Sequence, residues 1–306
     1  MPPQSQVSGQ GTRGGRVRLI RGPLVIGEPA PVVEAGLVAQ DPYRPDTVAD
    51  GGAAFGLTVR AASVRGLAKR YTGEPRQDDV CLRRHDATRT LIAVLADGVS
   101  AAPRADIAAA LAVRHAAAAV ARQLDADPAP PPIDWADVFG QAAWALVEEH
   151  RRSSGEPQAG VEQAAPLLAT TLLVAAVTVA DEEPIHVQVA AVGDSPALVL
   201  QARRFEPLVG ETPDAADLLG AGVDALPHKP HAFARAERTL GPGDVLLLAS
   251  DGLALPLGDG TGEVGRVLAR ELRRPPNVVD FARLLDFSRA TYDDDRSLIA
   301  VWSDRS

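Results

Sequence analysis

The sequence contains one cysteine, Cys81, among its 306 residues, which excludes an intrachain disulfide bond and a zinc site built from cysteines. Aromatic residues are also scarce (4%), although 46% of the residues are hydrophobic, so the core has to be built mainly from Ala, Val and Leu. This hydrophobic content is typical of a globular protein and excludes wholesale disorder. Cys81 stands among strand-forming residues, where a cysteine is more often a small buried apolar side chain than a reactive nucleophile.

Long apolar runs are missing as well. A membrane-spanning helix needs about 18 or more consecutive apolar residues, and the best candidate, residues 167–180, is too short and contains threonines. Residues 1–5 lack the charged segment followed by an apolar stretch that marks a signal peptide. We therefore expect a cytoplasmic protein that does not interact with a membrane.

Basic residues are fewer than acidic ones, 31 against 40, which gives a formal net charge of −9. Proteins that bind nucleic acid in general present a basic face, so nucleic acid is not an expected partner. Lys69 and Lys229 are the only lysines, and the other basic residues are arginines. The bias toward Arg and Ala is typical of GC-rich coding and says little about function.

The composition changes near residue 57. Residues 1–56 are rich in Gly and Pro and predict a partly ordered arm or linker with one short strand at 19–26. An arm that packs on the main domain is the alternative, since residues 32–38 offer apolar surface. We place one domain at residues 57–306.

Within this domain, apolar patterns predict strands and helices in a segregated order, which favours α+β layers over alternating βαβ units. The segment 205–233 lacks periodicity and predicts a long surface loop with a functional role. The expected strands span residues 57–64, 79–83, 90–96, 167–179, 185–192, 196–200, 245–249 and 297–302. The expected helices span residues 101–124, 134–147 with Asp134 as N-cap, 263–272 and 278–290.

Four aspartates, Asp78, Asp97, Asp251 and Asp294, each stand beside an apolar strand, and two of them are followed by glycine. Strand ends that converge would aim these carboxylates at one point, where they would repel one another and where burial would raise their pKa values. A hard divalent cation, Mg²⁺ or Mn²⁺, would resolve this conflict. Asp-Gly as a simple turn marker is the alternative. It is weakened because both Asp-Gly pairs end apolar strands.

Six short motifs occur in order along the chain: Arg76-Gln77-Asp78-Asp79, Leu95-Ala96-Asp97-Gly98-Val99-Ser100, Ala169-Thr170-Thr171-Leu172, Val192-Gly193-Asp194-Ser195, Leu248-Ala249-Ser250-Asp251-Gly252 and Asp294-Asp295-Arg296-Ser297. In this order they resemble the motifs of the metal-dependent protein phosphatase 2C family, bacterial members included. The resemblance covers about residues 57–302 and implies a four-layer αββα sandwich, in which two antiparallel sheets are flanked by helix pairs, with a dinuclear metal site at one edge. It also implies hydrolysis of phosphoserine and phosphothreonine on proteins by a metal-activated water.

The resemblance assigns metal ligands to matching positions. Asp97 would bridge two ions, and the backbone carbonyl of Gly98 would serve one of them. Asp251 and Asp294 would complete the shell of the other ion. Asp194 would hold a third Mn²⁺ or Mg²⁺ together with Asp251, as in many bacterial members, although a turn residue is the alternative for Asp194.

The remaining roles are assigned less sharply. Asp78 would support the metal-bound water, with Asp79 as the alternative in a register shifted by one. The arginine that binds phosphate in the family lies a few residues before the first motif, but the looser spacing here leaves Arg70 and Arg76 as candidates. A guanidinium fork suits a phosphate monoester, and an ordinary surface arginine is the alternative for each.

Two positions depart from the family pattern. Gln77 stands where many members carry Glu, and its neutral oxygen would bind the second metal more weakly or through water. Val99 stands where eukaryotic members carry a histidine proposed as general acid. None of His85, His115, His150, His186, His228 and His231 is placed to replace it.

The sequence favours a protein phosphatase that acts on phosphoproteins made by a Ser/Thr kinase. The alternative is a catalytically impaired member of the family that binds phosphoproteins or regulates a partner, because of Gln77 and the loose arginine spacing. A serine hydrolase built on Gly193-Asp194-Ser195 is disfavoured, because a strand and not a helix follows this motif.

Overall fold

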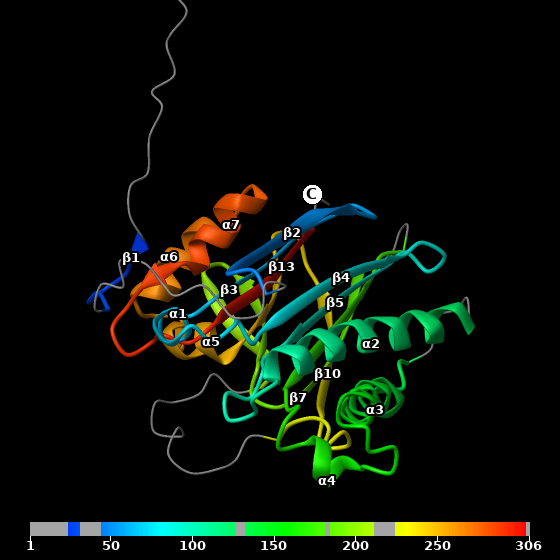
Figure 1. Cartoon of the computed structure of the whole chain (residues 1–306). Helices are drawn as coiled ribbons and strands as arrows, with labels where there is room; N and C mark the ends of the chain where they lie inside the picture. The colour runs from blue at the N-terminus through cyan, green and yellow to red at the C-terminus, as the bar shows by residue number, and fades with distance from the viewer. Residues whose placement is uncertain (1–23, 31–43, 127–131, 181–183, 211–223, 304–306) are drawn as a thin grey trace, which may run out of the picture.

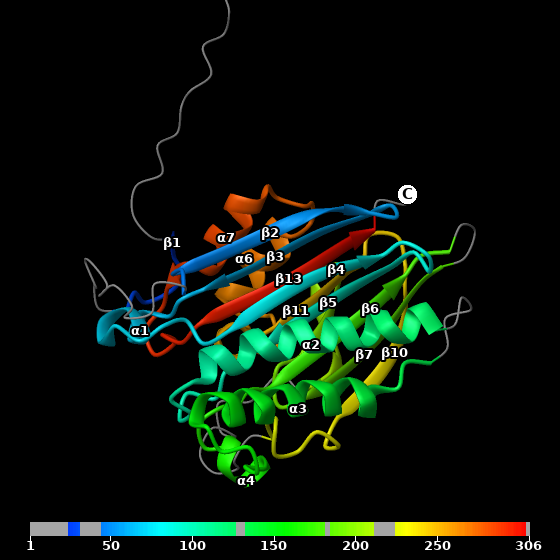
Figure 2. The same cartoon turned by 45° about the vertical axis from the view of Figure 1, so that its right-hand side comes forward.

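The computed structural model describes residues 24–30, 44–126, 132–180, 184–210 and 224–303. Two antiparallel sheets face each other in the centre of the molecule, and helices cover their outer faces (Figures 1 and 2). The expected αββα sandwich is therefore confirmed. Among the described residues, no helix is both long and apolar enough to cross a membrane.

The first sheet has five strands in the order β10-β7-β6-β5-β4 and carries helices α2 and α3 on its outer face (Figure 2). Its strands are β4 (Asp79–His85), β5 (Thr90–Ala96), β6 (Leu172–Thr178), β7 (Ile185–Val192) and β10 (Ala234–Leu240). The helices on this side are α2 (Ala105–Ala126), α3 (Trp135–Ser154) and the short α4 (Val161–Ala164).

The second sheet has six strands in the order β2-β3-β13-β11-β8-β9 and is covered by three short helices. Its strands are β2 (Thr47–Ala54), β3 (Leu57–Val64), β8 (Ala197–Gln201), β9 (Arg204–Val209), β11 (Val245–Ala249) and β13 (Arg296–Ser303). The helices are α5 (Asp251–Leu257), α6 (Glu263–Glu271) and α7 (Val278–Leu285). Helix α1 (Leu67–Thr72) links β3 to β4, and β1 (Leu24–Val25) pairs in parallel with β12 (Phe287–Ser288).

Three apolar layers explain why central strands are apolar at every position. In β5, Ile92 and Val94 face the layer under α2 and α3, whereas Leu91 and Leu95 face the layer between the sheets. Strand β11 divides its side chains in the same way between the inter-sheet layer and the layer under α5–α7. Because both faces are buried, the alternation of a half-exposed strand is absent.

Several elements differ from the sequence-based expectation. Strand β2 lies N-terminal to the expected arm boundary, so residues 56 and 57 fall inside the β2–β3 hairpin. Strand β9 occupies the start of the expected loop 205–233, whose central residues 211–223 lie outside the described part. The last helix, α7, ends at Leu285 and not at residue 290, because the chain then turns into β12.

Candidate active site

The candidate aspartates gather where strand ends of both sheets meet. In the first sheet, the start of β4 pairs with the end of β5, and the start of β6 pairs with the end of β7. In the second sheet, the end of β11 lies beside the start of β13, which lies beside the end of β3. The connection from β7 to β8 crosses between the sheets, so these two edges form one end of the sandwich.

Asp97 leaves the end of β5 and is held through its backbone. Its carbonyl accepts hydrogen bonds from the N–H of Thr171 (2.8 Å) and the hydroxyl of Thr170 (2.8 Å). Gly98 follows without a positive φ, so no left-handed turn requires this glycine. A Cβ at Gly98 would lie 2.7 Å from the carbonyl oxygen of Gln77, and this close approach is what requires glycine.

Asp251 begins α5 directly after β11 and brings the second sheet to Asp97. Its backbone N–H donates to Asp97 Oδ2 at 3.4 Å. Gly252 also lacks a positive φ, but a Cβ there would lie 2.0 Å from the carbonyl oxygen of Asp295. Both Asp-Gly pairs therefore mark points where two backbone segments touch, and not left-handed turns.

Asp294 and Asp295 precede β13 and share a cation that the sequence analysis did not single out. The ammonium of Lys69 in α1 lies 2.5 Å from Asp294 Oδ1 and 3.0 Å from Asp295 Oδ2. Asp295 also accepts the N–H groups of Gly66 (2.7 Å) and Gln77 (2.6 Å), so this buried carboxylate ties three segments together. The scarcity of lysine in the chain was the only sequence signal for Lys69, and it is a weak one.

Asp78 is buried at the entry to β4. Its Oδ2 accepts a hydrogen bond from the hydroxyl of Ser297 at 2.6 Å, and its backbone carbonyl accepts one from the Arg76 guanidinium. Asp79 points elsewhere and pairs with Arg44 at 3.2 Å. The charge of Asp295 acts on Asp78, and that of Asp78 acts on Asp97, so Asp78 belongs to the same cluster of carboxylates. Its role in supporting a metal-bound water stays a prediction.

Asp194 lies on the connection between the sheets, next to Gly193. Gly193 has a φ of +101°, and a Cβ there would lie 2.5 Å from Thr171 Cγ2, so both conformation and space require glycine. The charge of Asp251 acts on Asp194, which places the two carboxylates in one electrostatic cluster.

The two arginines predicted to bind phosphate have other partners in this structure. Arg70 holds Asp46 with two hydrogen bonds (2.9 and 3.0 Å) and Asp286 with one (2.9 Å). Arg76 is buried and donates to Ser63 Oγ (2.8 Å) as well as to the Asp78 carbonyl. Their role in phosphate binding stays a prediction.

Burial and mutual repulsion dominate the electrostatics of the cluster. Burial, reinforced by the charge of Asp295, raises the pKa of Asp78 to about 7. Burial and the charge of Asp251 raise the pKa of Asp194 to about 6. Burial and the charges of Asp78 and Asp251 raise the pKa of Asp97 well above its ordinary value. Burial, with the charge of Asp294, also raises the pKa of Asp251, although the hydrogen bond with Asp97 acts in the opposite direction. Such a cluster is stabilised by added positive charge.

The donor set fits a hard divalent cation. All candidate side chains offer carboxylate or amide oxygen, and the buried side-chain oxygen of Gln77 accepts no hydrogen bond from the described residues. Yet within the part of the chain that the structure describes, no three His, Cys, Asp or Glu side chains are grouped closely enough to hold an ion as they stand. The oxygen donors therefore suit a divalent cation, and in this structure Lys69 compensates part of their negative charge.

These pKa shifts predict how the metal-free protein responds to pH. In the folded state the pKa values of Asp78 and Asp194 lie above their ordinary value of 3.8. The folded state therefore binds more protons than the unfolded state between about pH 4 and 7. Stability should therefore fall as the pH rises through this window. In EDTA, we expect a higher melting temperature at about pH 5.5 than at about pH 7.5.

The Asp97→Asn variant is the control for this pH effect, since it removes one carboxylate of the cluster. The difference between the two melting temperatures should shrink in this variant. The prediction would be contradicted if the parent melted at a lower temperature at about pH 5.5 than at about pH 7.5 and the Asp97→Asn variant showed the same difference.

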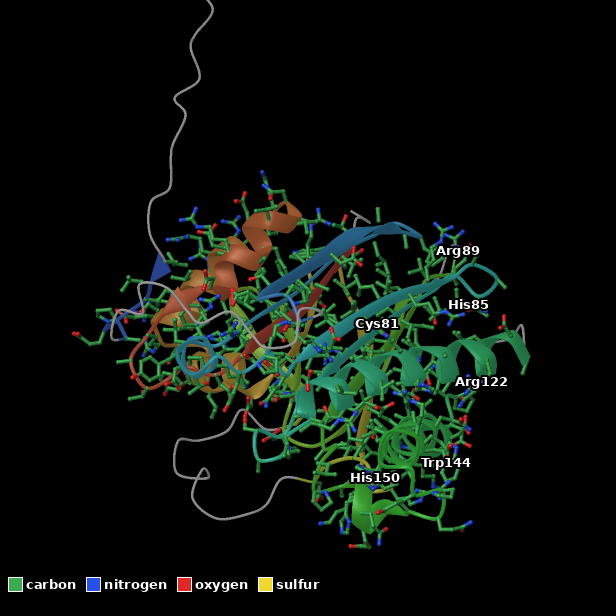
Figure 3. The ribbon with its side chains drawn as sticks, viewed as in Figure 1. Cys81, His85, Arg89, Arg122, Trp144 and His150 are labelled. Carbon is green, nitrogen blue, oxygen red and sulfur yellow. The ribbon has the colours of Figure 1, made fainter. Side chains whose placement is uncertain are left out.

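The histidines do not add to the cluster. His85 ends β4 at the end opposite to Asp79 and lies 2.8 Å from both Thr88 Oγ1 and Asp125 Oδ1 (Figure 3). His150 is buried in α3, on the far side of the first sheet (Figure 3). Neither lies at the strand ends that carry the aspartates.

Comparisons with known proteins identify the fold and the family. A family model described as protein phosphatase 2C matches residues 65–295. The PPM Ser-Thr phosphatase MsPP from Mycobacterium smegmatis, solved in complex with cacodylate, is 21% identical with a TM-score of 0.51, covering 80% of this chain and 97% of that chain. The S. agalactiae serine/threonine phosphatase is 14% identical with a TM-score of 0.53, covering 80% and 99%.

A third solved structure is the catalytic domain of the serine threonine protein phosphatase PstP in complex with two manganese ions. It is 21% identical with a TM-score of 0.50, and the match covers 80% of this chain and 97% of that chain. At these identities the likeness shows the fold. No curated protein matches the chain significantly.

Proposed function

The chain belongs to the protein phosphatase 2C family, and we propose that it hydrolyses phosphoserine and phosphothreonine on proteins at a site for two Mn²⁺ or Mg²⁺ ions. The observation that carries this proposal is the meeting of aspartates from both sheets at one edge, where the Asp251 N–H lies 3.4 Å from Asp97 Oδ2. Carboxylates whose pKa values are raised by burial and by one another favour a bound cation.

The proposed ligands lie next to the ends of strands. Asp97 would bridge the two ions, Gly98 would offer its carbonyl to one, and Asp251 and Asp294 would bind the other. Asp194 would hold a third ion together with Asp251. The chemistry that such ions supply when bound is a water nucleophile of lowered pKa and neutralisation of the phosphoryl charge.

The chain's own residues would keep this site in place. Ser297 fixes the Asp78 carboxylate by a 2.6 Å hydrogen bond, which orients Asp78 to accept a hydrogen bond from a water molecule in the site. Asp295 holds the backbone of Gln77 and Gly66 and so fixes the segments on both sides of α1. Water is the nucleophile in this proposal, so neither contact involves a nucleophilic protein side chain.

Of the two predicted phosphate ligands, Arg70 is the one that can change partners at lower cost. Its present partners, Asp46 and Asp286, are about half exposed, so water can solvate their carboxylates when Arg70, whose own side chain is 17% exposed, turns away from them. Arg76 is 1% exposed and would leave the buried carbonyl of Asp78 without its guanidinium donor. We therefore place the substrate phosphate nearer to Arg70.

A catalytically impaired, phosphoprotein-binding or regulatory protein is the second candidate. Gln77 in place of the family's Glu and the ion pair of Lys69 with Asp294 favour it, because both reduce the charge available to a second metal ion. Such a protein would bind phosphopeptides without turnover at any Mn²⁺ concentration.

The proposal is tested by hydrolysis of a phosphothreonine peptide in Mn²⁺, in Mg²⁺ and in EDTA. We expect turnover with either metal and none in EDTA, because all proposed ligands are hard oxygens. Full activity in excess EDTA would overturn the two-metal proposal. Binding without turnover in all three conditions would favour the second candidate.

Cys81 provides a test against a cysteine-based phosphatase. It lies in β4 and packs against the apolar layer under α2 (Figure 3), and burial together with the charge of Asp79 raises the pKa of its thiol. A thiol with a raised pKa is a poor nucleophile at neutral pH. We expect Cys81→Ser to keep nearly full turnover, and a complete loss in a folded variant would contradict the metal-based account.

A further inference from the structure

Lys69 is a buried cation inside an otherwise acidic site. Its side chain is 7% exposed, and its ammonium lies 2.5 Å from Asp294 Oδ1 and 3.0 Å from Asp295 Oδ2. Lys69 is therefore a fixed positive charge among the proposed metal ligands.

The two carboxylates that Lys69 contacts differ in their exposure to solvent and in their other hydrogen-bond partners. Asp295 is 1% exposed and already accepts two backbone N–H groups, which makes it a structural anchor. The Asp294 side chain is 45% exposed, and besides the ammonium of Lys69 it accepts the N–H of Asp295, at 2.7 Å. Lys69 thus places a full positive charge on a carboxylate that faces solvent and is otherwise held by a neighbouring backbone group.

We propose that Lys69 is an internal counter-cation that competes with a divalent metal ion for Asp294. This inference rests on the proposed function, since it concerns Asp294, which would complete the shell of the ion that Asp251 also binds. An ammonium and a divalent ion cannot both sit against one carboxylate oxygen without strong repulsion. The metal would bind there only after the ammonium has moved away.

The packing of α1 shows which part has to move. Gly66, just before the helix, lies so close to the following loop that a Cβ there would meet the Asp293 carbonyl oxygen and the Asp294 carbonyl carbon at 2.3 Å. Hydrogen bonds from the Ala68 N–H to the Asp293 carbonyl (3.1 Å) and from the Gly66 N–H to Asp295 Oδ1 (2.7 Å) hold the start of the helix against the backbone that carries Asp294. Release of Asp294 has to come from rotation of the flexible Lys69 side chain.

The first test measures Mn²⁺ binding to the full chain by titration calorimetry. Lys69→Met keeps much of the side-chain length and removes the charge, and we expect the Mn²⁺ ion that Asp251 and Asp294 would hold to bind at least about tenfold more tightly. The metal-free variant should also melt at a lower temperature, because Asp295 loses its buried partner. Lys229→Met is the matched control: Lys229 lies 2.6 Å from Asp224 Oδ1 in an exposed ion pair, and its loss should leave Mn²⁺ affinity unchanged.

The second test uses the parent protein, so it does not depend on how the variant folds. The chain has only two lysines, and mass spectrometry can follow how fast an amine-acetylating reagent modifies each. We expect Mn²⁺ to speed the labelling of Lys69 severalfold while the labelling of Lys229 stays constant. Slower or unchanged labelling of Lys69 at saturating Mn²⁺ would overturn the inference.

The outcomes separate this inference from the function beneath it. If the parent binds Mn²⁺ and hydrolyses phosphopeptide, but Lys69→Met binds Mn²⁺ equally or less tightly, the competition is wrong and the phosphatase proposal stands. If the parent binds no Mn²⁺ and Lys69→Met binds none either, both are wrong. Tighter binding by Lys69→Met alone supports the competition.

Discussion

Replacing Asp97 by Asn is expected to reduce the turnover of a phosphothreonine peptide by roughly a thousandfold, about 4 kcal/mol of transition-state stabilisation. Asp97 is the proposed bridging ligand, so the change removes charge from both metal shells. High Mn²⁺ should not restore activity, because the shared geometry is lost together with the affinity. Phosphopeptide hydrolysis across a Mn²⁺ titration measures this effect.

Asp294→Asn is the matched comparison, since it affects one metal only and should be partly rescued by more Mn²⁺. Asp97→Asn should fold as well as the parent in EDTA, because it removes a negative charge from a repelling cluster. Asp294→Asn should melt at a somewhat lower temperature in EDTA, because the buried Lys69 ammonium loses one of its partners. In Asp97→Asn, the new amide also keeps an oxygen that can accept the Asp251 N–H. Near-parental turnover of Asp97→Asn would show that the site is wrongly assigned.

Gly252→Ala should be strongly disruptive for so small a substitution. A methyl group at this position would lie 2.0 Å from the Asp295 carbonyl oxygen and 3.4 Å from Asp294 Cβ, so backbone has to shift. Overpacking of this kind costs about 3 kcal/mol of stability, more than the gain of about 1 kcal/mol that Ala brings to a helix. The shift would displace Asp294, so activity should fall too.

Gly140→Ala is the control for this substitution. Gly140 lies in helix α3, where an added methyl group would meet no described atom within 4 Å other than those of its own helix backbone and chain neighbours. Ala there should therefore stabilise the protein by about 1 kcal/mol. Urea unfolding of the two variants gives the free energies directly. Equal effects of the two substitutions would mean that the contact between Gly252 and Asp295 is not tight.

The sequence was sufficient for the central strands and the aspartates at their ends. Strand β5 could be predicted residue for residue, because burial on both faces makes it apolar throughout. Asp97 and Asp251 stood out because Asp97 directly follows β5 and Asp251 follows β11 after a single residue, Ser250. The reason for the glycines after them could not be predicted from the sequence. Gly98 is required by its contact with Gln77 and Gly252 by its contact with Asp295, and both partners are distant in the sequence.

The elements that were missed have weak local signals. Strand β2 is an edge strand with a mostly exposed, Gly-containing sequence, so no apolar alternation marks it. Helix α1 has six residues and no side-chain N-cap, and α5 contains Pro256. Lys69 could not be recognised as part of the site, because its partner Asp294 lies 225 residues further along the chain.

The most direct test of the account is the number of Mn²⁺ ions that bind to one chain, measured by titration calorimetry for the parent and for Asp97→Asn. If Asp97 bridges two ions, at least two ions should bind to the parent, and both high-affinity ions should be lost in Asp97→Asn with the fold retained. The same number of ions at the same affinity in both proteins, or no binding by the parent, would contradict the claim that these aspartates form a metal centre.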